Sequence, residues 1–238
     1  MSAYPEIVEQ LLAVRILRAL RSFYKYRELE EIFDLVAPII WRYISGKVLP
    51  SKDRAREILD KVIELKLAEK IVEKALKVGK RGYPDLSRII YDADVLSILA
   101  YEAYRVFESM RPTTILTVAV DGIPLSVFTA EMFGARLVIA KKEREAWVDD
   151  YYEEQILQRD PPLITSIYVP RNSIKYNDIV LIVDDLMRTG KTVKASINIV
   201  RKAGARLAGV FTMVAIGNEW RQTLSNENVK LHIVYTLP

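Results

Sequence analysis

One stretch decides the fold of the chain: residues 179–192 read IVLIVDDLMRTGKT. Its first five residues are apolar and mostly β-branched, which predicts a buried strand that ends in two carboxylates, Asp184 and Asp185. A Thr-Gly-Lys-Thr turn follows, and residues 192–202 then show helical spacing and are closed by Gly204. A strand, a loop and a helix in this order predict one unit of an α/β protein with a parallel sheet.

The same alternation continues on both sides of this unit. Apolar runs predict further strands over residues 115–120, 136–140, 164–169, 209–216 and 229–236. Helices are expected over residues 93–110 and 125–133, the second closed by Gly134. We therefore expect an α/β domain over residues 85–238, with a mostly parallel sheet that helices cover on both faces.

Residues 1–84 have a different pattern. Helical spacing over residues 6–22, 26–33, 38–44 and 52–65 predicts a small all-α domain, and Gly and Pro place its boundary in residues 77–84. The segment holds 17 Lys and Arg against 12 Asp and Glu, a net charge of +5, while the whole chain carries +4. Such an excess is typical of a surface that binds a polyanion, but an ordinary solvated helical surface also gives it.

Composition excludes several classes of protein. The chain has 238 residues, of which half are apolar and 28% charged, the balance of a globular protein. It has no Cys for disulfides or thiolate metal sites, and its single His, His232, lies in an apolar run and is interpreted as structural. No apolar run approaches the roughly 18 to 20 residues of a membrane span, and the N-terminus lacks the pattern of a signal peptide. We expect a cytoplasmic protein without membrane contact.

The loop after the strand over residues 179–183 carries the chemistry. Ligands of parallel α/β sheets bind at the carboxyl ends of the strands. The backbone N–H groups of residues 189–192 and the positive end of the next helix suit a phosphate group. Asp184 and Asp185 lie at the other end of the loop, where they can accept hydrogen bonds from two vicinal sugar hydroxyls. The pattern therefore predicts a phosphorylated ribose as ligand.

Two other interpretations of the loop were weighed. The letters Gly190-Lys191-Thr192 resemble the end of a nucleotide-triphosphate P-loop, but that motif requires Gly five positions earlier, where Asp185 stands. A strand end with two solvated acids and a capped helix, without any ligand, explains each piece separately but not the spacing of all of them.

The segment VLIVDDLMRTGKT, residues 180–192, resembles the phosphoribosyl-pyrophosphate signature of the type I phosphoribosyltransferases, and the similarity extends over most of residues 87–238. The resemblance implies that Asp184 and Asp185 are the catalytic pair that holds the ribose hydroxyls. It implies a 5′-phosphate loop made of Arg188, Thr189, Gly190, Lys191 and Thr192. It further implies a homodimer and a Mg²⁺ ion that bridges ribose hydroxyls and pyrophosphate, which the two Asp side chains contact indirectly, through those hydroxyls or water.

The resemblance also implies a pyrophosphate site. Asp121, Gly122 and Ile123 follow the first strand, where the family keeps its pyrophosphate loop, and Lys141 and Lys142 follow the second. Gly122 lets the backbone approach an anion, and the two Lys supply charge near it. The alternative for this Lys pair is an ordinary solvated strand end.

The segment between Lys142 and Ile164, where a mobile loop is expected, departs from the family. It lacks the Lys and the His of orotate-type relatives, although one of its Glu residues could imitate the loop Glu of adenine-type relatives. It holds two cations, Arg144 and Arg159, against seven acids, which are Glu143, Glu145, Asp149, Asp150, Glu153, Glu154 and Asp160. This departure argues against transfer chemistry.

The short helices of residues 26–56 resemble the helix-turn-helix heads that precede phosphoribosyltransferase-like domains in some archaeal and bacterial regulators. The resemblance implies binding of double-stranded DNA through candidate contacts at Arg42, Tyr43, Ser45, Lys47 and Lys52. A helical cap over the base pocket and a dimerisation arm are the alternatives. The preferred interpretation is a transcriptional regulator whose DNA binding responds to phosphoribosyl pyrophosphate or a nucleotide. The alternative is an active phosphoribosyltransferase, which forms a nucleoside monophosphate from a purine or pyrimidine base and releases pyrophosphate.

Overall fold

The computed structural model describes residues 6–79, 84–159 and 162–238. The chain divides into two compact units, residues 1–102 and 103–238, and the division falls inside helix α7 (Ala93–Phe107). The boundary expected from the sequence is residues 77–84, of which residues 80–83 lie outside the described part.

The N-terminal unit is mostly helical. After α5, residues Lys77 and Val78 pair antiparallel with Asp85 and Pro84, so the expectation of an all-α domain over residues 1–84 is wrong in this detail. No helix in the described ranges is long and apolar enough to cross a membrane. The elements are α1 (Glu6–Arg21), α2 (Tyr26–Phe33), α3 (Ala37–Ile44), α4 (Lys52–Glu64), α5 (Leu67–Ala75), β1 (Lys77–Val78), β2 (Pro84–Asp85), α6 (Ser87–Ile90) and the first part of α7.

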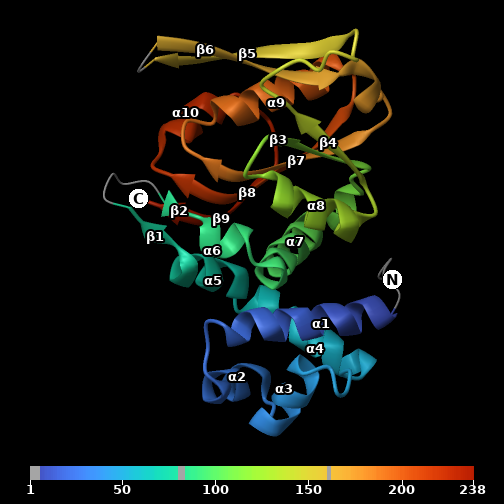
Figure 1. Ribbon diagram of the computed structural model, residues 1–238, viewed down its shortest axis with the longest axis vertical. Helices are drawn as coiled ribbons and strands as arrows, with labels where there is room; N and C mark the ends of the chain where they lie inside the picture. Colours follow the sequence, from blue (N-terminus) through green and yellow to red (C-terminus); the bar gives the residue numbers. More distant parts are fainter. Residues whose placement is uncertain (1–5, 80–83, 160–161) are drawn as a thin grey trace. The chain divides into compact units, whose positions relative to one another are not determined.

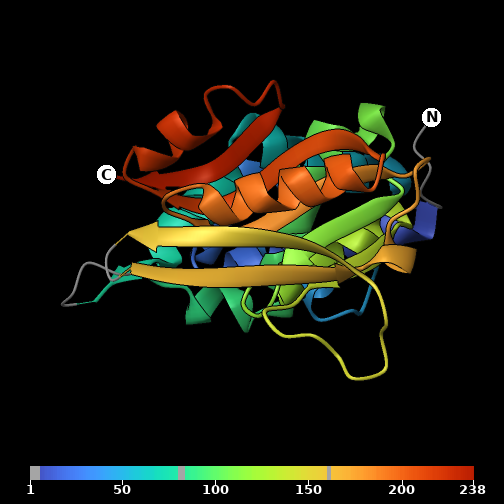
Figure 2. The ribbon, with the colours of Figure 1, turned by 90° about the horizontal axis from the view of Figure 1, so that it is seen from above.

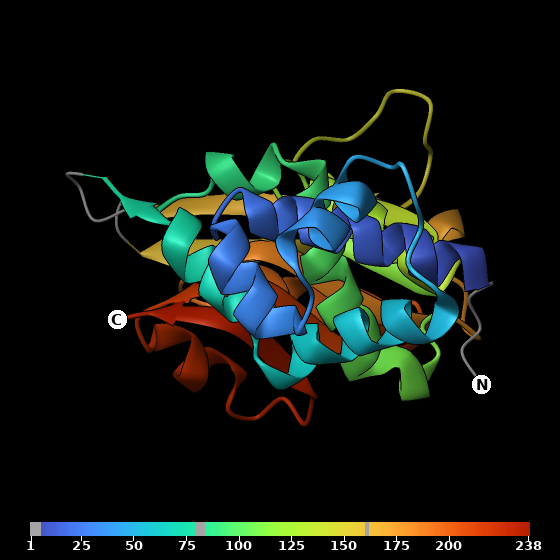
Figure 3. The ribbon, with the colours of Figure 1, turned by 90° about the horizontal axis from the view of Figure 1, so that it is seen from below.

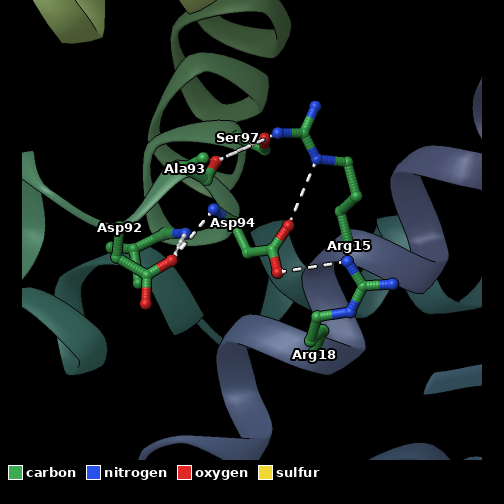
Figure 4. A network of polar contacts seen from close by, with 7 residues as sticks. Arg15, Arg18, Asp92, Ala93, Asp94 and Ser97 are labelled. Carbon is green, nitrogen blue, oxygen red and sulfur yellow. Dashed lines mark hydrogen bonds and ion pairs between the residues drawn. The ribbon is translucent and has the colours of Figure 1, made fainter. Parts of the chain in front are cut away.

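Helix α1 is the centre of this unit, because it packs against both α3 and α4. Its apolar side chains Ile16, Leu17 and Leu20 are completely buried. At its solvent side, Arg15 Nε and Arg18 Nη1 lie 3.2 and 3.5 Å from the two carboxylate oxygens of Asp94 in the first turn of α7 (Figure 4). These ion pairs hold α1 to the start of α7.

Helices α2 and α3 lie against each other, joined by residues 34–36 (Figure 3). The turn uses Asp34 in the left-handed conformation, with a φ of 53°. A short helix pair does not by itself establish a DNA-binding motif, so the helix-turn-helix assignment is not confirmed. Of its candidate contacts, Arg42 and Ser45 are exposed, Tyr43 is half-buried, Lys47 lies 4.2 Å from the centre of the Trp41 ring, and Lys52 begins α4.

The C-terminal unit is built on a five-stranded sheet in the order β4-β3-β7-β8-β9, and all its neighbouring strands are parallel. This confirms the α/β class and the parallel sheet. The elements are β3 (Thr114–Val118), α8 (Ile123–Phe133), β4 (Arg136–Ala140), β5 (Tyr151–Arg159), β6 (Pro162–Pro170), β7 (Ile179–Met187), α9 (Lys191–Lys202), β8 (Arg206–Ile216), α10 (Glu219–Leu224) and β9 (Leu231–Leu237). Single 3-10 turns cover Glu108–Met110 and Arg171–Ser173.

The strand order reverses between β3 and β7. From β3 the chain crosses through α8 to β4 on one side, whereas from β7 it crosses through α9 to β8 on the other. Crossovers between parallel strands are right-handed, so opposite directions place the two helices on opposite faces of the sheet, as Figure 1 shows. A crevice for ligands is expected outside the carboxyl ends of β3 and β7, where the order reverses.

Strands β5 and β6 form a separate antiparallel hairpin, which Figure 2 shows running alongside α9. The strand predicted over residues 164–169 is confirmed as part of β6, but it pairs with β5 and does not belong to the parallel sheet. The two faces of the hairpin differ in burial. Ile156, Ile167 and Val169 are buried in the core around α9, whereas Leu157 and Ile164 on the other face are exposed. The hairpin occupies most of the segment in which the sequence suggests a mobile loop.

Candidate functional site

The loops after β3 and β7 meet at the reversal of the sheet. After β3 the chain turns through residues 119–122, with a cis peptide bond between Ala119 and Val120, and α8 starts directly afterwards. Asp121 is exposed, and its charge acts on Asp185 at the end of β7. The structure thus brings the predicted residues Asp121, Gly122 and Ile123 to the carboxylate pair.

Gly122 is the point at which the two loops approach most closely. A Cβ atom added there would lie 3.4 Å from Oδ1 of Asp185 and 3.7 Å from Oδ1 of Asp184. It would also lie 2.6 Å from Oγ1 of Thr117, a distance that real Cβ atoms do not tolerate. The φ of Gly122 is −73°, which any residue can adopt. Glycine is therefore required for space rather than for backbone conformation.

The Asp184 side chain is buried, the Asp185 side chain is half-buried, and the two carboxylates interact with each other. Burial raises the pKa of Asp184 well above its usual value, and the charge of Asp185 raises this pKa further. Burial likewise raises the pKa of Asp185, although hydrogen bonds from the backbone oppose the effect, and the charge of Asp121 adds to it. The two side chains also hydrogen-bond to each other. Ionising both acids is therefore costly until a ligand supplies donors or positive charge.

The loop of residues 188–192 leads from β7 into α9. Gly190 caps the helix in the left-handed conformation, with a φ of 73°, and its carbonyl accepts a hydrogen bond of 2.9 Å from Lys194 N. Thr189 and Thr192 are half-buried, and Arg188 is exposed. The first backbone N–H groups of a helix have no partner within the helix and carry partial positive charge. The loop therefore offers donors to an anion.

Helix α10 supports this loop from behind. A Cβ on Gly190 would lie 3.2 Å from Trp220 Cβ and 3.3 Å from Leu224 Cγ. Trp220 is buried, and its Nε1 donates a 3.0 Å hydrogen bond to the carbonyl of Gly217. The position of the loop is thus fixed by direct packing against α10.

Two of the predicted cationic ligands have partners within the protein. Lys191 Nζ donates a 2.6 Å hydrogen bond to the carbonyl of Leu157, which links the loop to the β5–β6 hairpin. Lys141 Nζ lies 2.5 Å from Oε1 of Glu145, while the neighbouring Lys142 is exposed. In this state the anion-binding capacity of residues 188–192 comes from the backbone rather than from the Lys191 side chain.

Several acids of this segment form ion pairs with cations inside and outside it. The ion pairs are Arg144–Glu153 and Lys202–Glu154, both at 2.6 Å, and Arg171–Asp150 at 2.9 Å. The sequence count of two cations against seven acids is therefore misleading, because most of the partners lie outside the segment. Glu153 and Glu154 are engaged here rather than free to meet a base, and Asp160 lies outside the described residues.

No group of three or more His, Cys, Asp or Glu side chains in the described ranges could hold a metal ion by itself. Two adjacent carboxylates nevertheless match the chemistry of Mg²⁺, which keeps several waters and binds through one or two carboxylates together with substrate phosphates. The residues present fit a Mg²⁺ ion that arrives with an oxygen-rich ligand.

Sequence reasoning missed three residues of this region: Thr117, Leu157 and Trp220. Of the two hydroxyls in the strand of residues 114–118, Thr117 lies near the carboxyl end between apolar residues, which was a usable signal. Leu157 acts through its backbone carbonyl and Trp220 through packing, so neither leaves a pattern in the sequence.

Comparison with known proteins now identifies the C-terminal unit. Residues 90–230 match the family described as "Phosphoribosyl transferase domain". The chain is similar to the xanthine phosphoribosyltransferase of Lacticaseibacillus casei, with 33% identity over 120 residues that cover 50% of this chain and 62% of that protein. A relative of the same name from Lactobacillus gasseri is 28% identical over 134 residues, 54% of this chain and 70% of the relative. The chain thus spans less than two thirds of the first of these relatives.

Solved structures resemble the same region. The adenine phosphoribosyltransferase of Rhodothermus marinus superposes with a TM-score of 0.64 at 19% identity, covering 72% of this chain and 99% of that chain. The enzyme of Giardia lamblia complexed with 9-deazaadenine gives a TM-score of 0.63 at 18% identity, covering 71% and 98%. At these identities the likeness shows a shared fold.

These findings overturn the interpretation of the chain as a transcriptional regulator. The relatives it matches are named as transferases, and two acids of the segment that argued against transfer chemistry, Glu153 and Glu154, are held in ion pairs. The expected DNA partner and homodimer are tested by no contact in the structure, so both stay predictions. Because the family match covers more than half of the chain, the protein belongs to the phosphoribosyl transferase domain family.

Proposed function

We propose that the protein is an active phosphoribosyltransferase that transfers the 5-phosphoribosyl group of phosphoribosyl pyrophosphate to a purine base. One observation carries the proposal: the reversal of the sheet brings a carboxylate pair, a glycine loop and a helix start suited to an anion to one edge of the sheet. The purine class is supported by the xanthine and adenine phosphoribosyltransferases that the chain resembles. A pyrimidine substrate, which the sequence alone leaves open, has no such support.

The residues divide between the two ends of the donor. Asp184 and Asp185 accept hydrogen bonds from the two ribose hydroxyls, while the backbone N–H groups of residues 189–192 bind the 5′-phosphate. The raised pKa of both acids suits this role, because two hydroxyl donors offset the cost of their ionisation. Mg²⁺ bound with the donor supplies positive charge to the pyrophosphate, and the acid pair contacts it through ribose hydroxyls or water.

We assign the pyrophosphate to the loop of residues 121–123, which follows β3 at the reversal of the sheet and leads into α8. Lys141 and Lys142 add positive charge at the end of β4. Lys141 must leave Glu145 to reach the ligand, whereas Lys142 is exposed and available. Of the two, Lys142 therefore makes the first contact.

The reaction exchanges two bonds at the anomeric carbon of the ribose. A ring nitrogen of the base forms a bond to C1′, the bond from C1′ to the pyrophosphate oxygen breaks, and its electron pair leaves with pyrophosphate. The base loses one proton. The chain contributes mainly by holding both reactants in line and by stabilising the charge of the leaving group.

The test is product formation from phosphoribosyl pyrophosphate and Mg²⁺ with adenine, hypoxanthine, guanine, xanthine, uracil and orotate. We expect turnover with one or more purines and a loss of about 100-fold or more in Asp184→Asn. Asp150→Asn is the matched control, since Asp150 is exposed, pairs with Arg171 and has no assigned role in ligand binding. Absence of turnover with every base, or full activity of Asp184→Asn, would refute the proposal.

A further inference from the structure

The side chain of Thr117 has an unusual position on β3. It is completely buried, and its Oγ1 has no hydrogen-bond partner among the residues that the structure describes. Buried hydroxyls in native proteins are almost always hydrogen-bonded, because an unpaired one loses its bonds to water without replacement. The position of Thr117 therefore needs an explanation.

The hydroxyl points to the crevice. The space above Gly122, where a Cβ would lie, is bounded at 2.6 Å by Oγ1 of Thr117 and at 3.4 Å by Oδ1 of Asp185. Three side-chain oxygens, counting Oδ1 of Asp184 at 3.7 Å, thus converge on one small volume. A second buried hydroxyl without a partner, Thr212, lies on β8 opposite Asp184 in the strand register. Two buried hydroxyls without hydrogen-bond partners, those of Thr117 and Thr212, therefore lie near the acid pair.

The ligand-free state explains why the hydroxyl has no acceptor. The side chains of Asp184 and Asp185 interact with each other, and neither accepts a hydrogen bond from Thr117. A ligand whose two vicinal hydroxyls bind both carboxylates replaces that mutual interaction. A carboxylate oxygen released in this way becomes an acceptor for the Thr117 hydroxyl.

We propose that Thr117 is a positioning residue of the site, whose hydroxyl donates a hydrogen bond to Asp185 when the phosphoribosyl ligand is bound. The bond fixes one oxygen of Asp185 and thereby orients the other toward the ribose. Thr117 does not touch the reacting atoms. This role rests on the proposed function, because it requires a ligand that separates the two acids.

The experiment compares three variants of the full chain. Thr117→Val replaces the hydroxyl with a methyl group of similar size, Thr117→Ser keeps the hydroxyl, and Thr114→Val makes the same exchange on the same strand. Thr114 is also buried, but its Oγ1 accepts a 3.1 Å hydrogen bond from Arg136. Binding of phosphoribosyl pyrophosphate with Mg²⁺ is measured by calorimetry, and stability is measured by urea unfolding without ligand.

We expect Thr117→Val to weaken binding about tenfold or more, because a hydrogen bond to a charged group is lost, while its stability is unchanged or higher. Thr117→Ser should bind within a few-fold of the wild type. Thr114→Val should show the opposite pattern, with lower stability and unchanged binding. Wild-type affinity in Thr117→Val, or equal weakening in Thr117→Ser, would overturn the role. A wild-type protein that binds no phosphoribosyl pyrophosphate would refute the proposed function, and this role with it.

Discussion

Replacing Gly190 with alanine tests whether α10 fixes the phosphate loop. Gly190 has a φ of 73°, and an added Cβ would lie 3.2 Å from Trp220 Cβ and 3.3 Å from both Trp220 Cα and Leu224 Cγ. These neighbours cannot move aside easily, because Trp220 is buried and hydrogen-bonded to the backbone of Gly217. The loop must therefore shift away from α10.

The magnitude follows from two contributions to the free energy of unfolding. An alanine in the left-handed conformation costs about 1–2 kcal/mol. Crowding against packed neighbours costs a further 1–3 kcal/mol or so. Gly134→Ala is the matched control, since Gly134 ends α8 with a φ of 61° and has no atom within 4 Å of its added Cβ. We expect Gly190→Ala to be less stable than Gly134→Ala by at least about 1 kcal/mol.

The assay is urea unfolding of both variants, followed by calorimetric titration with phosphoribosyl pyrophosphate and Mg²⁺. Gly190→Ala should also bind the ligand at least about tenfold more weakly, because its helix N–H groups are displaced, whereas Gly134→Ala should bind normally. Equal stabilities of the two variants would show that α10 does not constrain the loop. Normal binding by Gly190→Ala would show that the loop is not the phosphate site.

Three further outcomes are expected. Burial alone would raise the pKa of Asp178, but hydrogen bonds from Lys175 N and Arg136 outweigh burial and lower this pKa. The ionised Asp178 therefore stabilises the fold above about pH 4, and this contribution is lost as the pH falls through the folded-state pKa. Asp178→Asn should be less stable than the wild type at pH 7, and the difference should shrink in unfolding curves measured in acid. Asp94→Asn, which removes both ion pairs to α1, should cost less than about 1 kcal/mol in thermal unfolding because the arginines are partly exposed, and a larger loss would contradict this accounting. Because the pKa of Asp184 is raised, the contribution of this side chain to folding stability is present below the unfolded-state pKa and is lost as the pH rises through the folded-state pKa. Asp184→Asn should therefore be about 1 kcal/mol more stable than the ligand-free wild type at pH 7. A less stable variant would contradict the cost assigned to burying the Asp184 carboxylate.

Local patterns were enough to predict the sheet and the acid pair. The run of residues 179–183 is apolar throughout, so the buried strand is visible in the letters, although β7 continues through the two acids to Met187. Gly134 lies immediately after the last apolar residue of α8 and adopts the left-handed conformation that ends a helix. In each of these cases the residues that decide the structure are neighbours in the sequence.

Structure that depends on distant partners was not predictable. The sequence predicts most of β6 but places β5 in an acidic loop, because Lys202 and Arg171, which pair with Glu154 and Asp150, lie outside the segment. The end of α4 was placed correctly to within a residue, but α5 was missed, since the turn between them uses Lys66 with a φ of 51° instead of a glycine. The link from Lys191 to the Leu157 carbonyl joins residues 34 positions apart and involves a backbone group, which no side-chain pattern reveals.

The unfavourable features of the C-terminal unit gather where ligand binding is proposed. Asp184 is a buried acid beside the half-buried Asp185, whose charge opposes its ionisation, and Thr117 is a buried donor without an acceptor. Natural sequences violate local rules mainly at functional sites, because a ligand can compensate there for what the protein alone leaves unsatisfied. A ribose with two hydroxyls and a Mg²⁺-bound pyrophosphate supplies donors to the acids and frees an acceptor for Thr117. The same ligand must then stabilise the folded protein through linkage, and it must do so more strongly in the wild type than in Asp184→Asn, where that strain has already been removed.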